Sequence, residues 1–148
     1  MRDSRLGTFG AAALFIVLLL KIAALAQLPF MVALTALPVA HGASRLSAVI
    51  VIATSRYARA EGIAKPVAKG IGAAPLVVAT LTGIAAVAVG AIILGLGAAL
   101  CGVAGLAIGH AATRLLFDRK LGGYTGDCLG AVQQISEVGF YLAVLAWL

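Results

Sequence analysis

The amino-acid sequence predicts an all-α fold, a polytopic membrane helix bundle of about five transmembrane helices. Of its 148 residues, 63% are hydrophobic and only 11% are charged, against about 25% charged in an average soluble domain. One small water-soluble core cannot hold that many apolar side chains. We therefore expect residues 1–148 to form a single membrane domain, with lipid against much of its surface.

The first two spans are expected between Leu6 and Ser55, where only Lys21 and Arg45 interrupt the apolar sequence. A break near Gln27-Leu28-Pro29 separates them, since proline suits the first turn of a helix. The basic N-terminus and the apolar run after it also resemble a secretory signal peptide. Lys21, however, lies where the apolar core of a signal peptide would meet its cleavage site, so we favour a span.

Two further spans are expected in residues 70–113, which contain no Asp, Glu, Lys or Arg. As one helix this segment would be about 66 Å long, twice the thickness of a bilayer core of about 30 Å. The turn between the two spans is predicted at Leu94-Gly95-Leu96-Gly97, because glycine tolerates positive φ. The spacing of Gly105 and Gly109 predicts close helix packing. A fifth span is expected from Asp127 to Trp147.

The basic residues test this number of spans, because loops on one side of a membrane collect them. With five spans, the N-terminus, the middle loop and the loop before the last helix share one side, and the two opposite turns are uncharged. The basic residues on the shared side are Arg2, Arg5, Arg56, Arg59, Lys65, Lys69, Arg114, Arg119 and Lys120. This side is cytoplasmic by the positive-inside rule. The net charge of +6 therefore indicates orientation and not nucleic-acid binding.

Polar residues and glycines concentrate in three segments of the same side, residues 2–10, 56–62 and 122–130. The last segment is glycine-rich and opens a helix, so its free backbone N–H groups favour an anion. Asp127 in that segment favours a cation, and a phosphate bridged by Mg²⁺ satisfies both. The competing explanation is that Asp127 is an ordinary helix N-cap. The residues alone thus predict a membrane site for an anionic, phosphorylated ligand.

Three charged residues lie inside the apolar spans. Arg45 and Glu137 are each about 15 Å below the cytoplasmic side, where ionisable groups are costly unless they are paired. We predict that Arg45 and Glu137 face each other inside the bundle, and that Lys21 extends toward the membrane surface. His41 and His110 are expected to be lone polar side chains inside the bundle, because neither has a metal-ligand partner at the required spacing. Cys101 and Cys128 lie near opposite faces in this topology, so we expect no disulfide between them.

The segments at residues 1–10, 56–62 and 122–137 resemble the adenosylcobinamide-GDP ribazoletransferase family, also called cobalamin synthases. The resemblance extends over essentially the whole chain. It implies a multi-pass enzyme of the cytoplasmic (inner) membrane with its active face toward the cytoplasm. It also implies that the 3′-hydroxyl of α-ribazole, or of its 5′-phosphate, attacks the cobinamide-side phosphorus of adenosylcobinamide-GDP. GMP is then released, and Mg²⁺ is required.

The resemblance also implies roles for individual residues. Asp3 and Asp127 are the candidate Mg²⁺ ligands. Phosphate and substrate binding is implied for Ser4, Arg5, Arg56, Arg59, Gly122, Gly123, Thr125 and Gly126. Arginine suits a pyrophosphate because its donors are forked, and glycine permits close approach of the backbone. No catalytic residue is assigned.

The family's aspartate-rich segment, DGLADTxDG, has no counterpart in this sequence. We therefore expect a C-terminal portion of a longer enzyme, the product of a truncated gene or one chain of a split enzyme, and little activity from the chain alone. Two other functions remain open. A CDP-alcohol phosphotransferase would need a DGxxAR signature, which is missing, and a small non-catalytic membrane subunit would be packed by its glycines. Binding of a cobamide precursor and an Asp127→Asn variant distinguish these possibilities.

Overall fold

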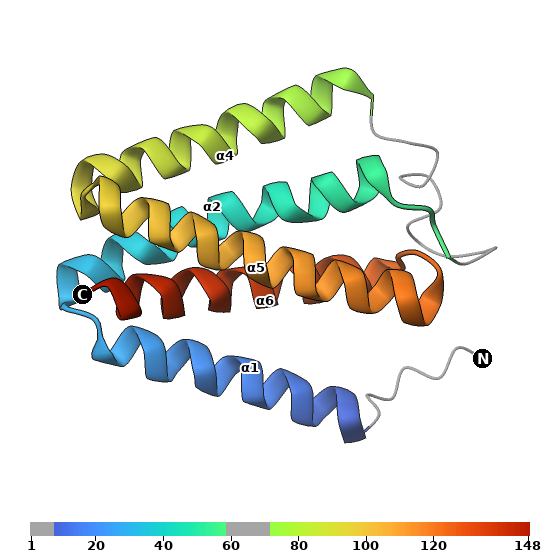
Figure 1. Cartoon of the computed structure of the whole chain (residues 1–148), viewed down its shortest axis with the longest axis horizontal. Helices are drawn as coiled ribbons and strands as arrows, with labels where there is room; N and C mark the ends of the chain where they lie inside the picture. The colour runs from blue at the N-terminus through green and yellow to red at the C-terminus, as the bar shows by residue number, and fades with distance from the viewer. Residues whose placement is uncertain (1–7, 59–71) are drawn as a thin grey trace.

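The computed structural model describes residues 8–58 and 72–148, which form five helices (Figure 1). These are α1 (Thr8–Gln27), α2 (Phe30–Thr54), α4 (Ala73–Leu94), α5 (Leu96–Leu121) and α6 (Gly126–Trp147). Each is long and apolar enough to cross a membrane. Within the described ranges the only β-type pairing is an isolated bridge between Tyr57 and Tyr124. The prediction of an all-α bundle with five spans is confirmed.

Proline and glycine separate the spans where the sequence predicts. Pro29, with φ −53° and ψ 141°, immediately precedes α2, so it is the N-cap of that helix and not a member of its first turn. Its carbonyl accepts the N–H of Ala33 at 2.9 Å. Gly95 alone separates α4 from α5 and has φ 87°. That backbone conformation favours glycine because it lacks a Cβ.

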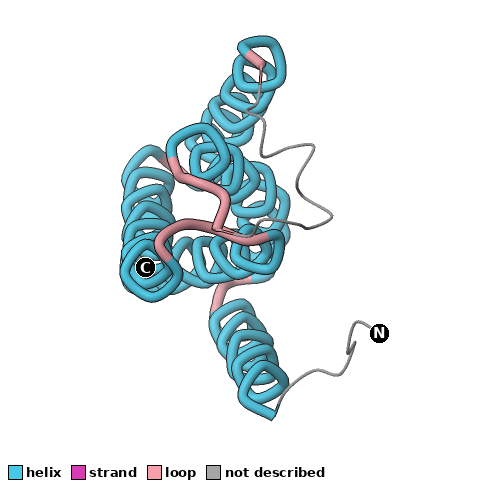
Figure 2. The backbone as a smooth tube through the Cα atoms, turned by 90° about the vertical axis from the view of Figure 1, so that its right-hand side faces the viewer, coloured by secondary structure: helices cyan, strands magenta, loops and turns pink. Residues whose placement is uncertain are grey.

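Helices α2, α5 and α6 pack against one another and form the centre of the bundle. Helix α1 packs mainly against α6, and α4 packs against α2 and α5, so α1 and α4 flank the centre on opposite sides (Figures 1 and 2). Both flanking helices expose large apolar side chains, among them Phe15, Ile22, Val78 and Ile84. Such surfaces suit lipid and not water.

All five helices run between the same two ends of the bundle. The start of α1, the end of α2, the start of α4, the end of α5 and the start of α6 lie together on the right of Figure 1. We call the part formed by residues 54–58 and 118–127 the loop end. The turns at Leu28 and Gly95 lie at the opposite end. Cys101 lies near that opposite end and Cys128 at the loop end, and both are free, as expected.

The backbones of α5 and α6 lie very close where the two helices cross, because glycines occupy the contact positions. A Cβ built on Gly105 would collide with the carbonyl oxygen of Gly139, and one on Gly139 would collide with the carbonyl oxygen of Gly105. A Cβ on Gly109 would lie 2.7 Å from the carbonyl oxygen of Ile135. The predicted close packing at Gly105 and Gly109 is therefore confirmed, and Gly139 supplies its partner surface.

We expect Gly105→Ala to lower the free energy of unfolding by about 1–3 kcal/mol, because the new methyl group must push two backbones apart. Unfolding of the purified protein in mixed micelles, followed by circular dichroism, measures this. Gly130→Ala is the matched control, since nothing lies within 4 Å of a Cβ at that helical position. It should be neutral or stabilising by up to about 1 kcal/mol. Equal effects of the two substitutions would contradict this account of the crossing.

Candidate functional site

At the loop end, the chain leaving α2 pairs with the loop between α5 and α6. The N–H of Ala58 donates to the carbonyl of Tyr124, and the N–H of Tyr124 donates to the carbonyl of Arg56, both at 2.9 Å. The rings of Tyr57 and Tyr124 meet edge to face, with centroids 5.5 Å apart. These contacts hold Arg56 beside the glycine-rich loop, although the two segments are far apart in sequence.

Two glycines shape this loop for different reasons. Gly122 caps α5 in the left-handed conformation, with φ 66°, and its N–H donates to the carbonyl of Asp118 at 3.1 Å. Gly123 has φ 156°, and a Cβ there would collide with the carbonyl oxygen of Arg56. Glycine is therefore required at position 123 because the backbone of Arg56 lies so close to it, and not because of a bound substrate.

Helix α6 begins after Thr125, which has extended backbone angles of φ −122° and ψ 172°. No side chain in the described part of the molecule caps this helix, and the Thr125 hydroxyl instead lies 3.2 Å from the Cys128 sulfur. Asp127 is in the first turn and exposed. The N-cap is Thr125, so the explanation of Asp127 as an ordinary helix N-cap is wrong. The first N–H groups of α6 and the exposed Asp127 carboxylate thus lie together beside the loop.

A buried cluster of Val51, Tyr124, Cys128 and Val132 packs the loop against α2 and α6. Burial raises the pKa of the Tyr124 phenol, and neighbouring Tyr57 raises it further, so this side chain stays neutral. The end of α5 is also tied to α2. The guanidinium of Arg114 donates to the carbonyl of Thr54 at 3.5 Å and lies 3.6 Å from the Asp118 carboxylate.

The structure brings six of the predicted site residues to the loop end: Arg56, Gly122, Gly123, Thr125, Gly126 and Asp127. The other four, Asp3, Ser4, Arg5 and Arg59, lie outside the described residues. No group of three His, Cys, Asp or Glu side chains with metal-binding geometry occurs in the ranges 8–58 and 72–148. Asp127 nevertheless fits one position of a Mg²⁺ site, because Mg²⁺ often takes one or two carboxylates and completes its shell with phosphate and water.

A second polar group lies in the middle of the bundle, around Glu137 of α6, whose side chain is 6% exposed. Its carboxylate forms an ion pair with the ammonium group of Lys21 at 2.5 Å and accepts the Ser44 hydroxyl at 2.9 Å. Lys21 also donates to Gln134, and Gln133 donates to Glu137 at 3.5 Å. We call this group, with His41 and Arg45, the Glu137 cluster.

The predicted pair of Arg45 and Glu137 is wrong, as is the expected extension of Lys21 toward the surface. Helix α1 packs on α6, and this contact turns Lys21 inward, where its side chain is only 13% exposed. Arg45 is exposed and contacts Glu137 only through His41. The contacts of Ser44, Gln133 and Gln134 could not be predicted, because their only signal is that they are polar residues within apolar spans.

His41 links the two ends of the cluster. Its Nε2 lies 3.3 Å from both Nε and Nη2 of Arg45, and its Nδ1 lies 3.3 Å from the carboxylate of Glu137. A guanidinium group only donates, so Nε2 accepts, and Nδ1 carries the hydrogen that is donated to Glu137. His41 is therefore not the lone polar side chain that the sequence led us to expect.

Comparison with known proteins identifies the family. A family model described as Cobalamin-5-phosphate synthase matches residues 1–145. The curated relatives named adenosylcobinamide-GDP ribazoletransferase include one from Ralstonia nicotianae that is 44% identical over 99% of this chain and 57% of its own length. One from Ralstonia pickettii is 41% identical over 100% of this chain and 57% of its own length. One from Shewanella sp. (strain ANA-3) is 38% identical over 98% of this chain and 56% of its own length.

The chain thus spans a little over half the length of the curated relatives that it matches. No solved structure is significantly similar to it. Because the family model matches nearly every residue, the chain belongs to the cobalamin-5-phosphate synthase family.

Proposed function

We propose that this chain supplies the Mg²⁺-dependent membrane site of an adenosylcobinamide-GDP ribazoletransferase. The observation that carries the proposal is the backbone pairing at the loop end, which brings Arg56 to the glycine-rich loop and the start of α6 in a chain of this family. The family model that matches is that of the cobalamin-5-phosphate synthases, so the CDP-alcohol phosphotransferase alternative is set aside. A non-catalytic membrane subunit is the alternative that the experiment below tests.

In the proposed reaction, a hydroxyl of α-ribazole, or of its 5′-phosphate, attacks the cobinamide-side phosphorus of adenosylcobinamide-GDP. The bond from that phosphorus to the bridging oxygen breaks, GMP leaves with this oxygen, and the hydroxyl proton is released. Positioning and charge stabilisation accelerate such displacements most. The forked donors of Arg56 and the free N–H groups of the first turn of α6 suit the pyrophosphate in both respects.

Asp127 is the described residue that would hold Mg²⁺, and Asp3, outside the described residues, is the second candidate ligand. The ion would neutralise charge on the pyrophosphate and on the departing GMP. We place the site on the cytoplasmic side of the inner membrane, because Arg56, Arg119 and Lys120 belong to the loop end and Arg114 lies one turn before it in α5.

A chimera tests the proposal, with this chain replacing the matching 57% of the Ralstonia nicotianae relative. In liposomes with adenosylcobinamide-GDP, α-ribazole 5′-phosphate and Mg²⁺, we expect equal amounts of GMP and adenosylcobalamin 5′-phosphate. Chelation of Mg²⁺ should abolish both, and this chain alone should form little. A folded chimera without product, or equal product from the unmatched portion of the relative by itself, would contradict the proposal; the second result would support the subunit alternative.

A further inference from the structure

The outward side of α2 carries two polar residues at mid-bilayer depth. Arg45 lies nine residues before the end of α2 at Thr54, which is about 14 Å along the helix. His41, with a side chain 54% exposed, lies one turn deeper. The exposed residues of this side recur every three or four positions and form one stripe, Leu34, Leu37, Pro38, His41 and Arg45. We call this stripe the outward face of α2.

The side chain of Arg45 does not extend toward the nearer membrane surface. A charged side chain that escapes the bilayer extends toward the closest interface, which for Arg45 is the Thr54 end of α2. Its guanidinium instead contacts His41, which is four residues farther from that end. Both contacts end on one atom, Nε2, and no other described atom accepts from the guanidinium group, which has five N–H donors. An arginine in this position is costly unless an acceptor covers it.

The charges of the Glu137 cluster indicate that the missing acceptor is a carboxylate. Glu137 is already compensated by Lys21, whereas Arg45 is within ion-pair distance of no carboxylate in the described part of the chain. The described residues of a second copy offer no carboxylate at this depth on their surface. Of the five acidic residues in the sequence, only the buried Glu137 lies in the middle of a described span, and Asp118 and Asp127 lie at the loop end.

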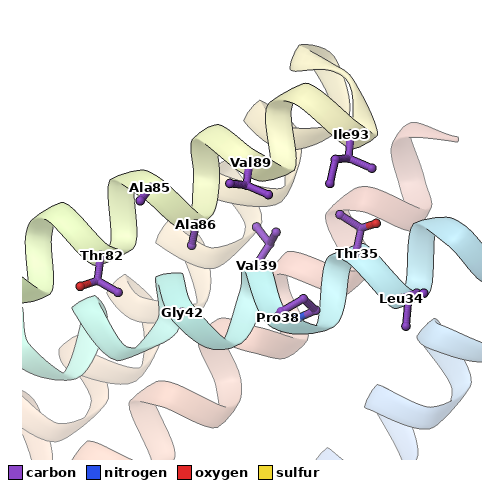
Figure 3. A pocket seen from close by; sticks show the side chains of 10 residues that line it. All are labelled: Leu34, Thr35, Pro38, Val39, Gly42, Thr82, Ala85, Ala86, Val89 and Ile93. Atoms are coloured by element: carbon purple, nitrogen blue, oxygen red, sulfur yellow. The ribbon is translucent and has the colours of Figure 1, made fainter.

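The depth of Arg45 also argues against a lipid headgroup, because headgroup phosphates lie about 15 Å from the bilayer centre. The acceptor must therefore come from within the membrane. Leu34 and Pro38 of the outward face also line an apolar groove between α2 and α4, together with Ala85 and Val89 (Figure 3). The surface that holds Arg45 thus continues into apolar contact area that the side chains of a helix can fill.

We propose that the outward face of α2 is the docking surface for a membrane-spanning helix that carries an Asp or Glu at mid-bilayer depth. The planar guanidinium of Arg45 suits a two-pronged contact with that carboxylate. His41 would then connect the incoming acid to Glu137 and Lys21. The curated relatives, of which this chain covers 56–57%, contain further sequence from which such a helix can come.

Binding of synthetic transmembrane peptides to the protein in nanodiscs tests the proposal. The peptides are Leu/Ala-rich helices of about 22 residues, long enough to span a bilayer, with a central Asp, Asn or Leu. Energy transfer between labelled peptide and labelled protein at pH 8 gives the dissociation constants. We expect the Asp peptide to bind about tenfold more tightly than the Leu peptide. This preference should be lost in Arg45→Gln and retained in Arg45→Lys.

Arg119→Gln is the matched control, because Arg119 is an exposed arginine of α5 at the loop end, far from mid-bilayer depth. This variant should keep the preference for the Asp peptide. Equal binding of the Asp and Leu peptides to the unaltered protein would overturn the proposal. A preference that persists in Arg45→Gln would overturn it too, because the carboxylate would then bind elsewhere. An Asn peptide that binds as tightly as the Asp peptide would show that the surface takes a neutral polar helix, not an acidic one.

Discussion

Replacing Glu137 with alanine should lower the free energy of unfolding by about 3–5 kcal/mol. The Glu137 carboxylate is the only anion within 4.0 Å of the Lys21 ammonium group in the described part of the chain, and both side chains are largely buried. Its removal leaves a positive charge inside the bundle without compensation. The hydroxyl of Ser44 also loses one of its two acceptors and keeps only the His41 carbonyl, at 3.0 Å.

A double-mutant cycle measures how much of this effect belongs to the ion pair. Unfolding free energies in mixed micelles are compared for Lys21→Met, Glu137→Gln and the double variant. We expect a coupling energy above about 1 kcal/mol, as for residues in direct contact. The matched cycle with Arg45→Gln in place of Lys21→Met should give a smaller value, because Arg45 contacts Glu137 only through His41. A larger coupling for Arg45 than for Lys21 would show that the sequence-based pairing was correct.

The spans and their turns could be predicted from the sequence because their signals are local. Long apolar runs define the helices, Gly95 and Pro29 interrupt them, and the basic residues fix which ends lie together. The rotation of each helix about its axis could not be predicted in the same way. Apart from the spacing of Gly105 and Gly109 on α5, the spans are apolar all around, so no periodic pattern marks the inner face. The α5–α6 crossing at Gly105 and Gly139, and the docking of α1, decide which side chains meet.

The residues of the candidate site could be predicted from the sequence, but the contacts that bring them together could not. The sequence indicates that Arg56 and the glycine-rich loop lie on the same side, yet it gives no sign that their backbones pair through Tyr124. An isolated bridge between segments so far apart leaves no motif. The sequence also leaves two roles open for Asp127, a metal ligand or a helix N-cap. Because α6 starts after Thr125, the carboxylate falls in the first turn instead of at the cap.

The Asp127 carboxylate should carry most of the metal binding available at the loop end. It is exposed, it lies in the first turn of α6, and it is not used as a cap. Asp127→Asn keeps the size of the side chain and one oxygen but removes the charge that Mg²⁺ requires. Metal-based charge stabilisation contributes several kcal/mol, and each 1.36 kcal/mol is tenfold in rate. We therefore expect a loss of about 100-fold in turnover.

The most direct measurement is the turnover of the chimera in liposomes as Mg²⁺ is titrated, for Asp127→Asn and for the control Asp118→Asn. Asp118 is also a carboxylate at the loop end, but it forms an ion pair with Arg114 at 3.6 Å. We predict that Asp127→Asn falls about 100-fold and that Asp118→Asn stays within about threefold of the unaltered chimera. If a folded Asp127→Asn chimera forms product as fast as the unaltered one at every Mg²⁺ concentration, Asp127 holds no catalytic metal and the proposed site is wrong.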